Sequence, residues 1–270
     1  MKHPQIRQPA VAGQFYNADP ARLRKELSEY MPRAEREKAI AIVSPHAGYS
    51  YSGSTAGALF SQIIIPETAI IISPIHRGPA VEFSLWPAGI WRTPLGDVEV
   101  DEDLSAALER NFPEISTDVA PHIREYSLEV QIPFLQMARE DIKIVPISIA
   151  CNKLQSLQRF GEAIAATVAA SGRDALLIAS SDMNHFEDEQ TTRVKDGKAI
   201  DAMLELDEGK LLRVVEREEI SMCGVAPAAA AIAAAKKLGA TSARLVKYAT
   251  SGDASGDYTQ VVGYAGIVVK

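Results

Sequence analysis

Three of the five histidines follow apolar stretches that have the composition of buried strands. His46 comes after AIAIV, His76 after AIIIS and His185 after ALLIAS. Asp182 stands three residues before His185, in SDMNHF. In open α/β sheets, ligands bind beyond the carboxyl ends of the strands, because the loops there vary without touching the core. We therefore expect these side chains to share one rim of a sheet, although a single loop histidine is more often solvated.

Cys223 lies in SMCGVAP, directly before an alanine-rich segment with a helical pattern. The positive end of a helix dipole favours the thiolate, which is the form of cysteine that binds metals. With two of the nearby histidines, this thiolate would give an N,N,S donor set that leaves positions open for a substrate. Such donors suit Fe(II), Cu or Zn, so the residue types do not select the metal. The alternative is a cysteine that only packs at the start of a helix.

Asp182 and His185 are candidates for the catalytic residues. Their spacing suits either support of the metal ligands from behind or an acid/base pair acting on a bound substrate. We expect no organic cofactor. The SGDASGD segment, residues 251–257, lacks the Lys and Ser/Thr of a phosphate-binding loop, and we interpret it as a tight turn.

The order of apolar runs and helical patterns predicts the fold class. Strands are predicted at residues 39–43, 69–73, 142–149, 175–180, 243–249 and 261–269. Helices are predicted at residues 19–31, 53–63, 101–112, 127–140, 154–171 and 225–239, and within 187–218. This alternation predicts one α/β domain over residues 1–270, with a largely parallel central sheet flanked by helices. Residues 81–101 interrupt this alternation of strands and helices and predict a hairpin that extends the sheet.

Composition excludes several classes of protein. The 270 residues are 47% hydrophobic and 23% charged, with a net charge of -7 and no dense run of Lys or Arg, so a nucleic-acid partner is not expected. No segment has the length and apolarity of a signal peptide or a membrane span. We expect a cytoplasmic protein with no membrane partner. The two cysteines are expected to be reduced, with Cys151 buried as a small hydrophobe.

Eight motifs in order resemble the Memo family, known in prokaryotes as AmmeMemoRadiSam system protein B. They are AVAGQFY, SPHAGYSYSG, SPIHRG, RTPLGDVEVD, PHIREYSLEVQIPFLQ, SSDMNHF, MCGVAP and SGDASGDYTQVVGYAG. The resemblance implies a fold like that of class III extradiol ring-cleaving dioxygenases. It also implies a metal site at His46, His76 and Cys223, with Asp182 and His185 as the acid/histidine pair.

Two positions depart from the family pattern. Tyr126 stands in EYSLE where the family has histidine, and a phenol titrates too high for a general base near neutral pH. Ile75 puts an apolar side chain beside His76 in SPIH. Around the site we expect Tyr49, Glu125 and Tyr126 to contact the substrate. Glu125 and Glu129 are expected on one face of a helix, where either could instead be solvated. Of the remaining histidines, we expect His3 at the surface and His122 in a loop, with a place at the pocket border as the weaker alternative.

Two functions are compatible with these residues. The first is a metal-dependent oxidoreductase using Fe(II) or Cu, with Zn as a further option, that acts on a small-molecule or peptide substrate. Cysteine in place of a carboxylate ligand argues against ordinary ring cleavage, because a thiolate is soft and oxidisable. The second is a non-catalytic module that binds a peptide or partner in a dioxygenase-like pocket. The resemblance also implies a functional link to AMMECR1-like and radical SAM proteins.

Overall fold

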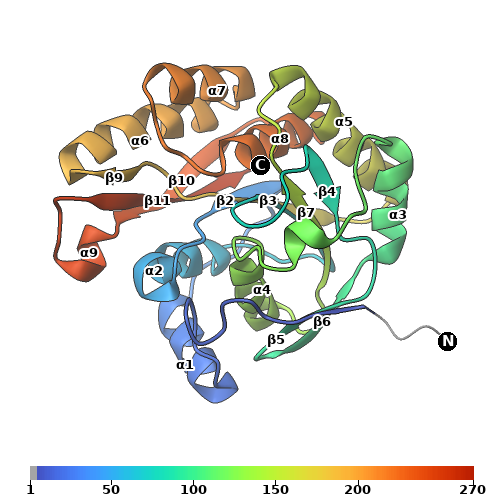
Figure 1. Cartoon of the computed structure of the whole chain (residues 1–270), viewed down its shortest axis with the longest axis horizontal. Helices are drawn as coiled ribbons and strands as arrows, with labels where there is room; N and C mark the ends of the chain where they lie inside the picture. The colour runs from blue at the N-terminus through green and yellow to red at the C-terminus, as the bar shows by residue number, and fades with distance from the viewer. Residues whose placement is uncertain (1–4) are drawn as a thin grey trace.

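A single sheet of eleven strands organises the chain in the computed structural model, which describes residues 5–270 (Figure 1). The expected surface position of His3 lies outside the described residues. The sheet order is β1-β5-β6-β7-β3-β8-β2-β11-β10, with β4 paired to β7 and β9 to β11. The strands are β1 (Ile6–Arg7), β2 (Ala41–Ser44), β3 (Thr68–Pro74), β4 (Phe83–Leu85), β5 (Ile90–Thr93), β6 (Gly96–Val100), β7 (Lys143–Ile149), β8 (Ala175–Ser180), β9 (His185–Glu187), β10 (Ala243–Thr250) and β11 (Val261–Val269).

The centre of the sheet is parallel. β6, β7, β3, β8 and β2 pair in parallel, whereas β4, β10 and β11 pair antiparallel with their neighbours. The central strands read as continuous apolar runs because helices cover both of their faces. Side chains of β3 alternate between the two cores, with Ile70 and Ile72 on one side and Ala69 and Ile71 on the other. The predicted α/β class with a mostly parallel, helix-flanked sheet is confirmed.

Helices form a layer on each face of the sheet, with α5 to α8 above it and α1, α2 and α4 below it in Figure 1. Among residues 5–270, none of these helices is both long and apolar enough to cross a bilayer. Their bounds are α1 (Pro20–Tyr30), α2 (Tyr49–Phe60), α3 (Glu102–Asn111), α4 (Ile132–Ala138), α5 (Leu154–Ser171), α6 (Glu189–Leu204), α7 (Glu208–Arg217), α8 (Val225–Lys237) and α9 (Gly252–Ser255), with short 3-10 turns η1 (Ala120–His122) and η2 (Glu129–Gln131).

Most of the predicted elements are present, and the differences have local causes. The hairpin predicted in residues 81–101 forms from β5 and β6 and extends the sheet beside β7. The helical stretch at 187–218 divides into α6 and α7, and Leu206 between them has a left-handed backbone. The pattern at 127–140 gives η2 followed by α4. Pro133, which lacks an N–H, is tolerated in the first turn of α4. The turn expected at 251–257 contains the single-turn helix α9.

Candidate functional site

The loops after β2, β3 and β8 leave the same edge of the sheet, because these three strands run parallel and side by side. His46, His76 and Asp182 each stand two residues after the end of their strand. Cys223 precedes α8, which packs across the same strands. The topology therefore brings together side chains from four distant parts of the sequence, as the sequence analysis expected.

The two imidazoles and the thiol lie within ligand distance of one another. Potential ligand atoms of His46, His76 and Cys223 are all within 4.8 Å of each other. Sγ of Cys223 is 3.1 Å from Nε2 of His46, and the two imidazole rings meet edge-on with centroids 5.1 Å apart. The predicted N,N,S donor set is thus assembled in space.

Hydrogen bonds fix which nitrogen His46 presents to the site. Ser180 donates its hydroxyl hydrogen to the carbonyl of Ser127 and accepts from the side chain of Gln131. Nδ1 of His46 lies 2.9 Å from the same hydroxyl oxygen, so Nδ1 carries the hydrogen and donates it. Burial, with the nearby His76, lowers the pKa of His46 well below its ordinary value. The ring is neutral, and its Nε2 lone pair faces Cys223.

Glu125 fixes which nitrogen His76 presents to the site, as Ser180 does for His46. Its carboxylate accepts the backbone N–H of His76 and lies 3.0 Å from Nδ1 of that ring. Burial would raise the pKa of Glu125, but hydrogen bonds from His76 and Ser127 outweigh it and lower the pKa to about 2. An ionised carboxylate can only accept, so Nδ1 of His76 is the donor and Nε2 is free. A carboxylate behind an imidazole is the arrangement that orients histidine ligands in metal sites.

Cys223 is held against the sheet by the glycine that follows it. A Cβ on Gly224 would lie 2.4 Å from the carbonyl oxygen of Ser180 and 2.4 Å from Cβ of Ser181, so only glycine permits this approach. Burial and the carboxylate of Asp182 raise the pKa of the Cys223 thiol well above its ordinary value. The prediction that the helix terminus favours a thiolate is therefore wrong. Burial is the largest cause of this shift, and Gly224 rather than Cys223 caps α8.

Asp182 and His185, the predicted catalytic pair, lie on the loop after β8 and at the start of β9. Asp182 accepts the backbone N–H of His46 at 2.7 Å, and its second oxygen is 3.8 Å from Nε2 of that ring. Burial raises the pKa of Asp182 and outweighs the hydrogen bond from His46 that lowers it. Nδ1 of His185 lies 2.9 Å from the carbonyl oxygen of Ser221 and therefore donates to it. This bond leaves the Nε2 atom of His185 as the one available for proton exchange.

The sequence profile of the Memo-like protein family matches residues 7–268. The chain belongs to the Memo family. A MEMO1 family protein of Methanopyrus kandleri is 42% identical, covering 98% of this chain and 99% of the relative. A MEMO1 family protein of Archaeoglobus fulgidus is 43% identical, covering 98% of this chain and all of the relative.

One solved structure supports the fold alone. An uncharacterized protein from Escherichia coli K12 superimposes with a TM-score of 0.51 at 13% identity, covering 86% of this chain and 100% of that chain. This likeness shows an α/β architecture shared at low identity. The further likeness to extradiol dioxygenases stays a prediction for this member of the Memo family.

The three predicted substrate contacts differ in position. The hydroxyl of Tyr49 donates to the carbonyl of Val130, and the side chain is buried, so the structure gives Tyr49 a place in the core with no access for a substrate. Glu125 is fully buried and bonded to His76, which makes it a support for that ring. Tyr126 is half-buried and stacks on His76 with centroids 4.9 Å apart. Of the three, only Tyr126 both lies beside the triad and is partly exposed.

Two carboxylates predicted on one helical face point to different partners. Glu125 lies in the loop before η2, so the pair does not share a helix, and that prediction is wrong. Glu129 accepts from Arg7, from the hydroxyl of Tyr16 and from the backbone N–H of Ala10. Both carboxylates are fully buried, which excludes the solvated alternative. Their different environments follow from the loop geometry, which no local sequence pattern reveals.

Several residues with a role in the site escaped the sequence analysis. Ser180 and Gln131 orient His46, and Arg7 donates from Nη2 to the carbonyl of Glu125. Of these residues, only Ser180 could have been found from the sequence, because it is the polar residue that ends the ALLIAS strand. His122 is fully buried between Ser84 and Ser148, so it is a core residue and does not border the pocket.

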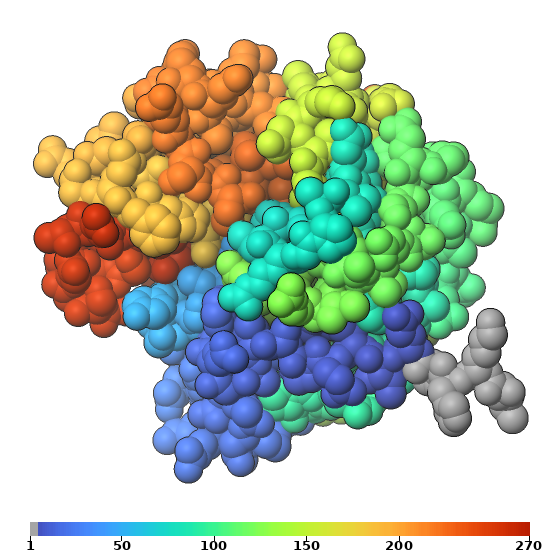
Figure 2. Space-filling view, in the orientation of Figure 1, coloured from blue at the N-terminus to red at the C-terminus, as the bar shows by residue number. Residues whose placement is uncertain are grey.

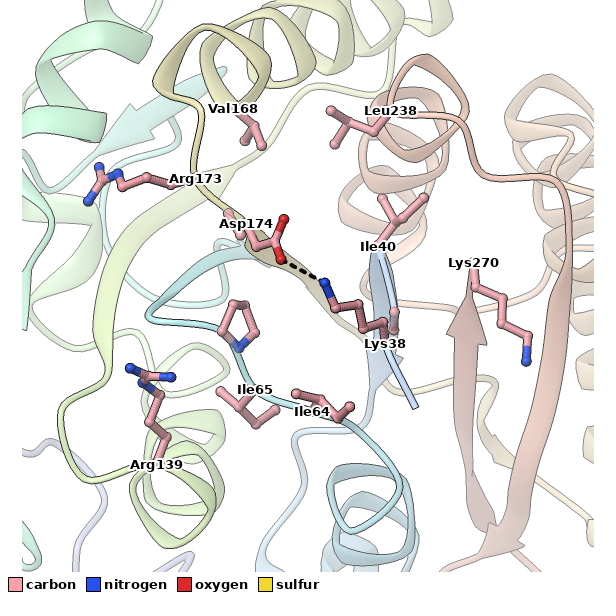
Figure 3. Close-up of a pocket in the computed structure, with 13 residues that line it drawn as sticks. Lys38, Ile40, Ile64, Ile65, Arg139, Val168, Arg173, Asp174, Leu238 and Lys270 are labelled. Carbon is pink, nitrogen blue, oxygen red and sulfur yellow. Dashed lines mark hydrogen bonds and ion pairs between the residues drawn. The ribbon is translucent and has the colours of Figure 1, made fainter. Parts of the chain in front are cut away.

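A separate cavity of about 460 Å³ lies at the opposite end of the central strands (Figure 3). Its walls are mainly apolar, from residues such as Ile40, Ile65 and Leu238, and Lys38 pairs with Asp174 across it. Within residues 5–270, no histidine or cysteine lines it. The Memo family motifs that carry the candidate site residues lie instead at the carboxyl ends of the strands. Cys151, as expected, is a buried core residue.

Proposed function

We propose that this Memo family chain binds one metal ion through His46, His76 and Cys223 and uses it for redox chemistry. The observation that carries the proposal is the convergence of two free Nε2 atoms and one sulfur, while the opposite nitrogen of each imidazole is bonded to a supporting side chain. Three protein donors with an open fourth position are typical of catalytic metal sites. Fe(II) and Cu are the favoured ions, and Zn is the alternative.

The spacing of the donors fits an ion. Metal–nitrogen bonds of about 2.0 Å and metal–sulfur bonds of about 2.3 Å place tetrahedral ligands about 3.5 Å apart. Here the ligand atoms range from 3.1 Å apart to within 4.8 Å. His46 is neutral and presents the lone pair of Nε2, whereas the Cys223 thiol has to lose a proton when an ion binds. The thiol now donates toward His46, and its proton would leave with metal entry.

The residues of the chain have distinct roles in this proposal. A bound Fe(II) or Cu ion would supply one-electron chemistry, with a soft sulfur donor that disfavours ordinary ring cleavage. Asp182 holds the His46 backbone and places a carboxyl beside the ligand atoms. His185 exchanges a proton with the substrate at Nε2, because its Nδ1–H is committed to Ser221. Tyr126 forms the wall next to His76.

Metal analysis tests this proposal directly. Protein purified without oxygen should contain close to one equivalent of Fe, Cu or Zn. His46→Ala and Cys223→Ala should each lose it. Cys151→Ala, which removes the buried core thiol, is the matched control and should keep the metal. Retention of metal by both site variants would remove these residues as ligands.

A second function is favoured by one observation. Phe186, beside His185, is 71% exposed and has a left-handed backbone with φ of 62°, so it carries both strain and exposed apolar area. These features support recognition of a peptide or partner without catalysis. In that case the parent protein would hold no tight metal, while Phe186→Ala would lower affinity for the partner. AMMECR1-like and radical SAM proteins are the proposed functional associates.

The proposed ligand chemistry also bears on location. Cys223 must stay a free thiol to bind an ion, and both Cys151 and Cys223 are free in the structure. Free thiols persist in reducing compartments. We propose a cytoplasmic location on this ground.

A further inference from the structure

A groove of about 430 Å³ borders the site on the side of His76. The N-terminal segment forms one wall, including Ile6 and Arg7, and the loops with Arg77 and Arg124 form another. Figure 2 shows the blue N-terminal segment lying against the cyan and green segments on the same face of the molecule. This groove has no part in the proposed metal binding, so its chemistry calls for a separate explanation.

The charge of the groove is positive, although the chain as a whole has a net charge of -7. Arg7, Arg77 and Arg124 line it, and none of the lining residues among those that the structure describes is Asp or Glu. Arg7 is buried and neutralised by Glu129. Arg77 and Arg124 are exposed, and neither forms an ion pair within residues 5–270. The first four residues, MKHP, contain no acidic side chain that could pair with them.

A stack of three side chains connects the groove to the metal ligands. The guanidinium of Arg77 lies over the ring of Tyr126, 5.4 Å from its centroid. Among the rings that contact Tyr126, which include Phe15, the ring of His76 stacks on it with centroids 4.9 Å apart. An anion held by Arg77 would therefore lie two side-chain layers from a proposed metal ligand. That distance suits the far end of a bound substrate.

Apart from Gln5 and Gln8, the remaining walls of the groove are apolar. Trp86 lines it while remaining buried, and its indole N–H is already bonded to the carbonyl of Ala88. Ile6 and Ile123 are 38% and 53% exposed, which is unusual for isoleucine in a folded chain. Two guanidiniums beside exposed apolar side chains match a molecule with an acidic group on a hydrocarbon or aromatic body.

We propose that this groove is the substrate subsite for an organic anion, with a carboxylate or phosphate held by Arg77 and Arg124 and an apolar body against Ile6 and Ile123. The substrate role rests on the proposed metal function. Binding of the anion does not, because no metal ligand lines the groove. Guanidinium groups pair with both acidic groups in a bidentate manner, so the two are distinguished by experiment.

The experiment uses the full chain stripped of metal by a chelator and follows tryptophan fluorescence during titration, which comes from Trp86 in the groove and from Trp91 packed against it. The probes are phenylacetate, phenyl phosphate and the neutral phenylacetamide. We expect saturable binding of at least one anion and no saturation with phenylacetamide. Arg77→Gln combined with Arg124→Gln should weaken the anion about tenfold or more, since two charge-assisted contacts are lost. Arg22→Gln on α1, another exposed arginine, should bind like the parent.

Three results would overturn the proposal. They are equal binding of phenylacetamide, unchanged affinity in the double variant, and the same loss of affinity in Arg22→Gln. The stronger of the two anions identifies the acidic group. Unfolding curves confirm that the variants are folded, and metal analysis of the double variant should match the parent. Failure of the metal proposal would appear only in the metal analysis, so the two outcomes are distinguishable.

Discussion

The carboxylate of Glu125 accepts both the backbone N–H and the ring Nδ1–H of His76. Two bonds to one carboxylate fix the tautomer and the direction of the imidazole, and Ser127 holds the carboxylate from behind. His46 is oriented by a hydroxyl instead, from Ser180. The two imidazoles therefore face the same point, although a charged carboxylate supports His76 and a neutral hydroxyl supports His46.

Glu125→Gln tests this support. The amide keeps the volume of the side chain but removes the charge and half of the accepting capacity, so His76 is less firmly oriented. We expect metal affinity to fall about 10- to 100-fold. Competition with a coloured chelator measures the affinity. Glu99→Gln, on an exposed side chain of β6, is the control and should leave it unchanged. Equal affinity in Glu125→Gln and parent would mean that Glu125 only packs.

Gly224→Ala should displace Cys223 from the site. The added Cβ would meet backbone and Cβ atoms of Ser180 and Ser181 at about 2.4 Å, and these cannot move without distorting β8. We expect a loss of about 1–3 kcal/mol in the free energy of unfolding, with lower metal content. Gly197→Ala in α6 is the control, because nothing lies within 4 Å of its new Cβ. Alanine there should stabilise the helix by about 1 kcal/mol. Loss of stability in both variants would mean that the backbone change from glycine to alanine, and not the contact with Ser180 and Ser181, is responsible.

Arg7 and Glu129 form a buried ion pair that links the N-terminal segment to the loop of Glu125. Glu129→Gln would leave the Arg7 guanidinium buried without its counter-charge. We expect destabilisation of about 3–5 kcal/mol, measured by denaturant unfolding. Asp174→Asn breaks the exposed pair with Lys38 and should have a much smaller effect. Equal effects of the two substitutions would contradict a special role for burial.

The sequence predicted those parts of the molecule that depend on local patterns. The strand at 175–180 and the helix at 154–171 have the predicted bounds, because apolar period and flanking residues define them. The rule for sheet edges placed His46 and His76 on one rim, whereas the choice of these two with Cys223 came from the resemblance to the Memo family. The role of Glu125 followed from neither, since it depends on a loop held by Arg7 from 118 residues away. Burial also reversed the expected ionisation of Cys223, and burial is a property of the whole fold.

His122 should make stability depend on pH. Burial, with the charge of Arg7, lowers its pKa to about 3. Below an unfolded pKa of about 6.5 the unfolded chain gains a proton that the folded chain does not, so stability falls as pH drops from about 6.5 to about 3. The slope from this group is up to about 1.4 kcal/mol per pH unit. His122→Gln, which can still bond Ser84, should lose less stability than the parent between pH 7.5 and pH 5 in urea unfolding. Identical pH dependence would show that His122 is protonated in the fold.

Asp196 should make the folded chain less stable as the pH rises, which is opposite to the effect of His122. Burial raises its pKa to about 6, although the hydroxyl of Tyr248 and the backbone N–H of Asn184 donate to its carboxylate. With an unfolded pKa of about 3.9, the folded chain holds the proton more tightly, so this stabilisation is full below about pH 4 and is lost as pH rises to about 6.

Asp196→Asn mimics the protonated acid and removes that dependence. Relative to the parent, the variant should therefore gain stability between pH 4 and pH 7, by up to about 1.4 kcal/mol for each pH unit crossed below pH 6. Unfolding in urea at pH 4.5 and pH 7 measures the change. The exposed substitution Asp257→Asn is the control for general charge effects. A constant difference between Asp196→Asn and parent across this range would mean that Asp196 is already ionised at pH 4.5, because Tyr248 and Asn184 compensate its burial in full.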